Sequence, residues 1–208
     1  MRLGIFYHFR MYRWRSMNDE QRVIEMKRRL LARMPMHSPR HYDGGRRVYL
    51  ITAACYQHRP YIGFSDQRMD DFSGMLRSVI AEKCERLDAW VVLPNHYHVL
   101  VLTYALPDLL FSLGRLHGRS SHAWNGEENA RGRKIWFNSV ERPIRNDRHH
   151  IVAMQYIHHN PVKHGYVTRW HEWKWSSAKD YIASIGREEA ERRWRECPLH
   201  AFGKGWDD

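Results

Sequence analysis

The stretch WVVLPNHYHVLVL, at Trp90–Leu102, decides the fold of this 208-residue chain. Two apolar runs of strand length flank the pair Pro94-Asn95, which is typical of a tight turn. The stretch therefore predicts two antiparallel strands, Leu87–Leu93 and His96–Thr103, joined directly by that turn.

The second of these strands carries a His-x-His motif. Side chains alternate along a strand, so His96 and His98 share one face while Tyr97 points to the other. Two imidazoles roughly 6.5–7 Å apart at the backbone can converge on one metal ion. Chance alone produces such a pair easily among fifteen histidines. Its position in a run of Val and Leu favours a functional site, because buried imidazoles need polar partners.

The surrounding sequence supplies the other elements of the domain. We expect a strand at Val48–Cys55, a helix at Asp66–Arg86 capped by Ser65 or Asp66, a helix at Leu106–Trp124, a strand at Ile135–Val140, and a helix that begins after Asn146 or Asp147 and ends at Asn160 before Pro161. This order predicts an α+β domain with helices packed on a mostly antiparallel sheet.

The last of these helices lies in a second informative stretch, DRHHIVAMQYIHHNPVKHGYV at residues 147–167. Tyr156 and Asn160 are four residues apart, about 40° around a helix, so both can face the same neighbour. Taken alone, a helical Tyr is usually a core residue and an Asn before Pro usually a cap. His158 and His159 compete as candidate ligands.

Together the two stretches resemble the REP-associated tyrosine transposases, a group of the HUH single-tyrosine transposases. The shared motifs are PNHYHVLV and, about sixty residues later, QYIHHNPVKHGYV, with further similar pieces at YLITA (49–53), DAWVVLP (88–94), PIRN (143–146) and WKWSS (173–177). The resemblance spans residues 46–181 and implies a ferredoxin-like HUH domain. Tyr97 is a departure, since the family has an aliphatic residue there, but it faces away from the histidines.

The resemblance also implies an activity. Tyr156 would be the nucleophile, and His96, His98 and Asn160 would hold Mg²⁺ or Mn²⁺. Such an enzyme cleaves and rejoins single-stranded or hairpin DNA, in particular REP-like palindromes, through a 5′-phosphotyrosine. The base that activates the tyrosine stays open between His149, His150 and metal-bound water.

Charge supports a nucleic-acid partner. The net charge is +11, and the first 47 residues hold twelve Lys/Arg against four Asp/Glu, or +8; such a surface suits a polyanion. We expect DNA contacts from Arg46, Arg47, Arg145 and Lys163. Residues 18–34 predict an amphipathic helix with one basic face, which either contacts DNA or packs on the main domain.

The expected organisation is a basic N-terminal extension (1–45), a catalytic domain (46–183) and a C-terminal tail (184–208). Three cysteines without C-x-x-C spacing predict neither a disulfide framework nor a zinc finger, and favour a reducing cytoplasm. No apolar stretch reaches the 18 or so residues of a membrane span. We therefore expect a cytoplasmic, nucleoid-associated monomer or homodimer.

Two other functions fit parts of the pattern. A non-catalytic protein that binds single-stranded or hairpin nucleic acid would need neither Tyr156 nor a metal. A metal-dependent hydrolase would use His96 and His98 to activate water and would form no covalent adduct. The tryptophans at 170, 173 and 175 can stack on bases or pack in the core.

Overall fold

The computed structural model describes residues 45–200, 202 and 203, and, nearer the N-terminus, residues 18, 20, 21, 23, 24 and 27. The chain divides into two compact units, Met1–Arg40 and His41–Asp208. In the first unit the described residues from 20 onward are helical, and Asn18 and Gln21 cap each other through their backbone N–H groups and side-chain oxygens. The rest of the expected basic extension lies outside the described residues.

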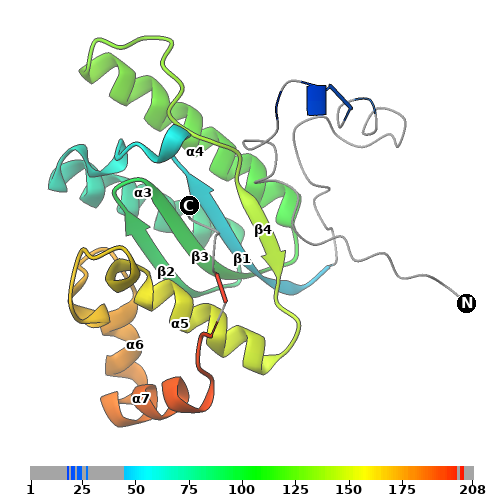
Figure 1. Cartoon of the computed structure of the whole chain (residues 1–208), viewed down its shortest axis with the longest axis vertical. Coiled ribbons are helices and arrows are strands. Elements are labelled where there is room, and N and C mark those ends of the chain that lie inside the picture. Colours follow the sequence, from blue (N-terminus) through cyan, green and yellow to red (C-terminus); the bar gives the residue numbers. More distant parts are fainter. Residues whose placement is uncertain are drawn as a thin grey trace, which may run out of the picture. The chain divides into compact units, whose positions relative to one another are not determined.

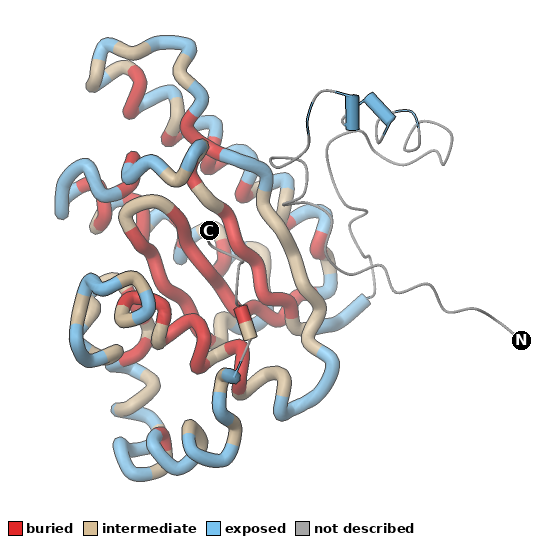
Figure 2. Tube along the Cα trace, viewed as in Figure 1, coloured by how far each residue is buried: buried red, intermediate tan, exposed pale blue. Residues whose placement is uncertain are grey.

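The second unit is built on a four-stranded antiparallel sheet (Figure 1). Its strands are β1 (Arg47–Ala54), β2 (Arg86–Leu93), β3 (His96–Thr103) and β4 (Val140–Pro143), in the order β2-β3-β1-β4. The predicted hairpin pairs Leu93 with His96 across the Pro94-Asn95 turn. Every residue of β3 is buried, as Figure 2 shows for the inner strands. The predicted α+β class is confirmed.

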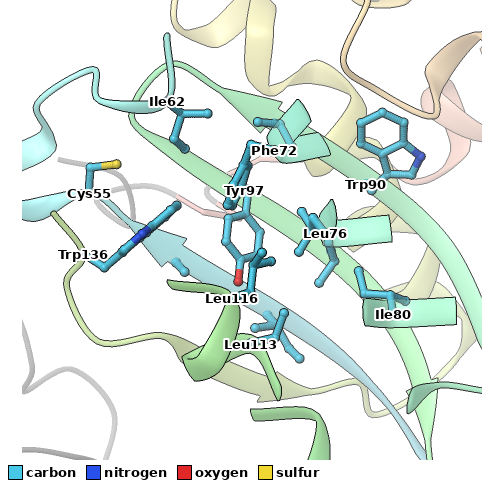
Figure 3. Close-up of a cluster of buried hydrophobic side chains, with 14 of the residues drawn as sticks. Cys55, Ile62, Phe72, Leu76, Ile80, Trp90, Tyr97, Leu113, Leu116 and Trp136 are labelled. Carbon is cyan, nitrogen blue, oxygen red and sulfur yellow. The ribbon is translucent and has the colours of Figure 1, made fainter. Parts of the chain in front are cut away.

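Helices cover both faces of this sheet. They are α3 (Asp66–Lys83), α4 (Leu106–Glu127), α5 (Asp147–Lys163), α6 (Ala178–Ile185) and α7 (Arg187–Glu196), with short 3-10 turns at Tyr56–His58, Ile62–Phe64 and Trp170–Glu172. The side chains of α3 and α4 pack around Tyr97 on one face of the sheet, and Figure 3 shows Phe72, Leu76, Leu113 and Leu116 there. On the opposite face, α5 packs against β2 and β3. In the described part of the chain, no helix has the length and apolarity that crossing a membrane requires.

Two predicted elements differ from the structure. The strand expected at Ile135–Val140 is wrong, because β4 begins only at Val140, and Trp136 makes a single isolated bridge to Cys55. Ile135 and Trp136 are adjacent yet both join the Tyr97-side core, so this segment does not alternate as a strand does. Pro143 fits because β4 is an edge strand, where a missing N–H is tolerated.

Pro161 does not end α5, contrary to the prediction. The helix continues to Lys163, and the next bonds are still made: the His164 N–H donates to the Asn160 carbonyl at 3.1 Å and the Tyr166 N–H to the Pro161 carbonyl at 2.9 Å. A proline in the last turn removes one N–H only, which buried packing against the sheet can offset. The predicted N-cap is confirmed, since Asn146 accepts a hydrogen bond from the His149 N–H at 2.8 Å.

The sequence predicts only a tail after residue 183, but this segment contains α7 and packs on the domain. Leu199 and Phe202 lie against the core on the α5 side of the sheet. The tryptophan cluster also serves packing: Trp170 stacks on Trp194 with ring centroids 4.8 Å apart, and the Trp173 indole N–H donates to the Val92 carbonyl at 2.8 Å.

Two buried histidines make the fold sensitive to acid. Burial disfavours the charged imidazolium, which lowers the pKa of His117 to about 4 and that of His158 to about 3. In the unfolded chain both pKa values return to about 6.5. Between the folded and unfolded pKa values the unfolded state therefore binds more protons than the folded state, and acid stabilises it. The melting temperature should therefore fall as the pH drops from about 6.5 toward 4. The variant His158→Gln, which cannot titrate, should show a shallower fall in thermal melts, and an equally steep fall would contradict this assignment.

Candidate functional site

The structure brings the four predicted site residues together between β3 and α5. The Nε2 of His96 lies 3.0 Å from the Oδ1 of Asn160. The His98 ring centroid lies 5.1 Å from that of Tyr156 and 5.0 Å from that of His96. All four side chains are at most 3% exposed. Residues some sixty positions apart in the sequence thus form one compact polar group inside an apolar surround.

Local packing explains how α5 presents these side chains. Ala153, Tyr156, Ile157 and Asn160 recur at intervals of three and four residues, so they form one face of the helix. Ala153 and Ile157 are fully buried in the core on this side of the sheet. The small side chain of Ala153 allows a close approach to the strands. The remaining positions on this face therefore place a phenol and an amide over the histidine pair.

Polar neighbours hold both imidazoles in the sheet. The Nδ1 of His98 lies 2.7 Å from the Oγ1 of Thr52, its direct cross-strand partner on β1. The Nδ1 of His96 lies 2.7 Å from the Oδ1 of Asn95. Each ring is thus tethered through Nδ1 on the sheet side.

The donor set fits a divalent cation. Both ring nitrogens of His96 face amide oxygens, those of Asn95 and Asn160, which can only accept hydrogen bonds. A neutral imidazole carries one N–H, so the contact with Asn160 fits either a cation between Nε2 and Oδ1 or a rotated amide whose Nδ2 donates to Nε2. Two imidazoles and an amide oxygen suit Mn²⁺ and tolerate Mg²⁺. Among the described residues, no group of three or more His, Cys, Asp or Glu could hold a metal ion. The Asn160 oxygen, 3.0 Å from the His96 Nε2, is the candidate third ligand that the sequence predicts.

Three further residues lie at the site that the sequence did not predict. His164 has its ring centroid 5.0 Å from that of His96, and Phe202 has its own 5.6 Å from that of Tyr156. Gly203, at φ +75°, approaches so closely that a Cβ there would collide with the Tyr156 ring. His164 could have been found, since it follows Asn160 by one helical turn. No sequence signal places residues 202 and 203 here.

Of the expected DNA-binding residues, only Lys163 lies at the site. Its Nζ is 5.6 Å from the Tyr156 ring centroid and donates to the Gly203 carbonyl at 3.5 Å. Arg46 pairs with Glu85 at 3.1 Å, and Arg47 lies opposite Thr103 at the far end of β1. Seven residues of strand, roughly 23 Å, separate Arg47 from the position paired with His96. Arg145 is exposed just before α5.

The competing histidines point elsewhere. His158 is bound to the Oγ of Ser177 at 2.9 Å, and the His159 ring packs on Trp194. His150 pairs with the Asp88 carboxylate at 2.8 Å, and the His149 ring packs on Phe202. His158 and His159 therefore do not lie beside Asn160 as competing metal ligands in this structure. The base for Tyr156 stays open.

An inner strand of the sheet thus presents two histidines to a tyrosine and an amide on one covering helix, which is the arrangement that the resemblance to the single-tyrosine transposases implies. Two curated relatives are similar to the chain in sequence. The chain is 33% identical over 111 residues to a REP-associated tyrosine transposase of Escherichia coli (strain K12), a match covering 50% of this chain and 62% of that protein. It is 29% identical over 147 residues to a Haemophilus influenzae protein of the same family name, a match covering 58% and 77%. Both relatives are named REP-associated tyrosine transposases, so the resemblance predicted from the sequence motifs is confirmed.

A solved structure agrees with the fold. The structure of a REP-associated tyrosine transposase bound to a REP hairpin superposes with a TM-score of 0.57 at 20% identity. The superposition covers 71% of this chain and 86% of that one. No protein-family model matches the chain. The chain thus spans about three fifths of the first curated relative's length and shares its sheet architecture with the hairpin-bound protein.

Proposed function

We propose that this chain cleaves and rejoins single-stranded DNA beside REP-type hairpins through a 5′-phosphotyrosine on Tyr156. The observation that carries the proposal is the convergence of Tyr156 and Asn160 on the His96–His98 pair. Core packing alone would not require a phenol and an amide over two buried imidazoles. The REP hairpin bound by the solved structural relative supports hairpin DNA as the partner.

The side chains of this chain have separate roles in the proposed reaction. The Tyr156 oxygen attacks phosphorus, the bond from phosphorus to the 3′-oxygen breaks, and the phenol proton is transferred, through a base that stays open, to that leaving oxygen. The products are a 5′-phosphotyrosine and a free 3′-hydroxyl, so a second 3′-hydroxyl can reverse the step and reseal a strand. Lys163, beside the ring, supplies a positive charge for the phosphate.

His96, His98 and Asn160 would hold the divalent ion. When bound, Mg²⁺ or Mn²⁺ polarises the scissile phosphate and stabilises the charge that develops on it. A cation held by these three residues would lie beside Tyr156, because the His98 ring packs against the Tyr156 ring and Asn160 follows Tyr156 by one turn of α5. Burial of the group keeps competing water away, which strengthens each electrostatic contact.

A second candidate function has its own supporting observation. Phe202 and Gly203 lie directly against the Tyr156 ring and so cover the proposed nucleophile. A protein that only binds hairpin DNA would tolerate that cover. Its affinity would depend on salt and on basic residues, and it would be indifferent to Tyr156 and to metal.

One experiment separates these functions and the hydrolase. A hairpin DNA with a labelled single-stranded flank is incubated with the full chain and Mn²⁺, then denatured and run on a gel. The proposed function gives a label that stays on the protein and disappears with EDTA. A binding protein gives intact DNA and no adduct. A hydrolase gives cleaved DNA with a free 5′-phosphate and no adduct.

The basic extension gives a separate prediction about DNA affinity. Deleting residues 1–45 removes ten Lys/Arg and four Asp/Glu, or +6 of the net charge of +11, so hairpin binding should weaken. The slope of log affinity against log salt should become shallower by roughly 0.7–0.9 for each DNA phosphate that the extension neutralises. Adduct formation at saturating DNA should persist, because His96, His98, Tyr156 and Asn160 all remain.

A thermal melt of the truncated protein is the control for that deletion. If the extension is scaffold, its apolar face at 18–34 packs on the domain. The melting temperature would then fall sharply while the salt slope stays unchanged. That outcome would contradict a phosphate-binding role.

A further inference from the structure

We infer that Asn95 and Thr52 are positioning residues, which fix the tautomer of His96 and His98 so that each presents an unprotonated Nε2 to a divalent cation. The inference rests on the proposed function for the identity of that cation. It concerns two residues outside the expected ligand set, one in the β2–β3 turn and one on β1. Its physical basis is that a histidine nitrogen binds a metal only when it carries no proton.

The orientation of the Asn95 amide is fixed by its second contact. Its Nδ2 donates to the His58 carbonyl at 3.1 Å, and a carbonyl can only accept. The Oδ1 of Asn95 is therefore the atom that faces the Nδ1 of His96, at 2.7 Å. Because this oxygen accepts, Nδ1 must carry the proton. The neutral ring then has its lone pair on Nε2, the atom that lies 3.0 Å from the Asn160 oxygen.

The backbone around Asn95 strengthens this constraint. The Cys55 N–H donates to the Asn95 carbonyl at 2.7 Å, which ties the turn to the end of β1. Gln57 and His58 are both non-glycine residues at positive φ, 56° and 52°, a conformation that L residues seldom adopt. This unusual loop aims the His58 carbonyl at Asn95. The cost of such a backbone is consistent with a loop that is held in place for the site.

Thr52 has the matching position for His98. The two residues are direct cross-strand partners on β1 and β3, so their side chains lie on the same face of the sheet. Thr52 is 7% exposed and His98 is fully buried, so the 2.7 Å contact between Oγ1 and Nδ1 is shielded from water. A threonine hydroxyl can donate or accept, so the contact itself allows both tautomers. The tautomer that we infer is the one in which the hydroxyl accepts from Nδ1 and the lone pair of the His98 ring lies on Nε2. Both imidazoles then present an unprotonated Nε2 to α5.

The test compares isosteric and conservative variants. Thr52→Val removes the hydroxyl at nearly constant volume, whereas Thr52→Ser keeps it. Asn95→Leu removes the acceptor for the His96 Nδ1. Thr103→Val is the matched control, because Thr103 is a buried hydroxyl residue on the same sheet that bonds the Lys83 carbonyl.

Two measurements decide the outcome. The ¹⁵N NMR spectrum of the metal-free protein should show His96 and His98 as Nδ1–H tautomers. Calorimetric titration with Mn²⁺ alone should show about 10- to 100-fold weaker binding for Thr52→Val and Asn95→Leu, as expected when the partner behind a metal ligand is removed. Thr52→Ser and Thr103→Val should bind close to the wild-type affinity.

Other results would overturn the inference. Nε2–H tautomers in the wild-type protein contradict it directly, as do Val and Leu variants that bind Mn²⁺ like the wild type. The NMR measurement needs neither DNA nor metal. A wild-type protein with the expected tautomers and Mn²⁺ affinity but no DNA adduct would therefore count against the proposed function alone.

Discussion

Tyr156→Phe is expected to abolish the covalent DNA adduct and strand cleavage, with a loss of roughly 1000-fold or more, as when the nucleophile of an enzyme is removed. Only the hydroxyl is lost, so the ring contacts to His98 and Phe202 persist. Hairpin affinity should stay within a few-fold of the wild-type value. The measurement is the denaturing gel with labelled hairpin DNA, beside a binding titration.

Tyr166→Phe is the matched control. Tyr166 lies three residues after the end of α5, is 41% exposed, and packs its ring on Trp173. This variant should form the adduct at the wild-type rate. If Tyr156→Phe still forms the adduct and Tyr166→Phe does not, the nucleophile is Tyr166 and the assignment to Tyr156 is wrong.

His96→Ala and His98→Ala should each remove metal-dependent cleavage, with losses of roughly 100-fold or more. Either change leaves one imidazole and one amide, which is a poor site for a divalent ion. The domain should remain folded, because apolar residues supply most of the core on both faces of the sheet. Cleavage rates in Mn²⁺ and in EDTA, together with thermal melts, measure the effect.

His158→Ala is the control for this pair. His158 is as deeply buried as His98, but it bonds Ser177 away from the site. It should lower the melting temperature while Mn²⁺ affinity stays near the wild-type value. Wild-type cleavage by either His96→Ala or His98→Ala, or cleavage that resists EDTA, would rule out the metal assignment.

The sequence predicts well those elements whose pattern is local. The β2–β3 hairpin follows from two apolar runs around Pro94-Asn95, and the start of α5 follows from Asn146 as a cap. Helix and strand periods predict that Tyr156 and Asn160 share one face and that His96 and His98 share another, whereas the meeting of the two faces was implied by the family resemblance. The family resemblance supplied the roles of these residues, which no periodicity contains.

The parts that sequence reasoning missed depend on contacts between distant segments. The position of β4 is set by its pairing with β1, where Leu50 lies opposite Arg142. The sequence of β4 has no run of apolar residues that would predict a strand. Pro161 is tolerated because tertiary burial outweighs one missing N–H. Phe202 reaches Tyr156 from 46 positions further along the chain, which only the folded arrangement reveals. These are tertiary effects that override local preference.

The burial of β3 has a consequence for how the site fails. The strand is paired on both edges and covered on both faces, so its amides should exchange with solvent only when the whole domain opens. No partly unfolded form of the domain can then keep the sheet while His96 and His98 move apart. A cation held there would add its binding free energy to the stability of the entire sheet. Heating this protein should therefore leave its histidine pair intact until the domain melts.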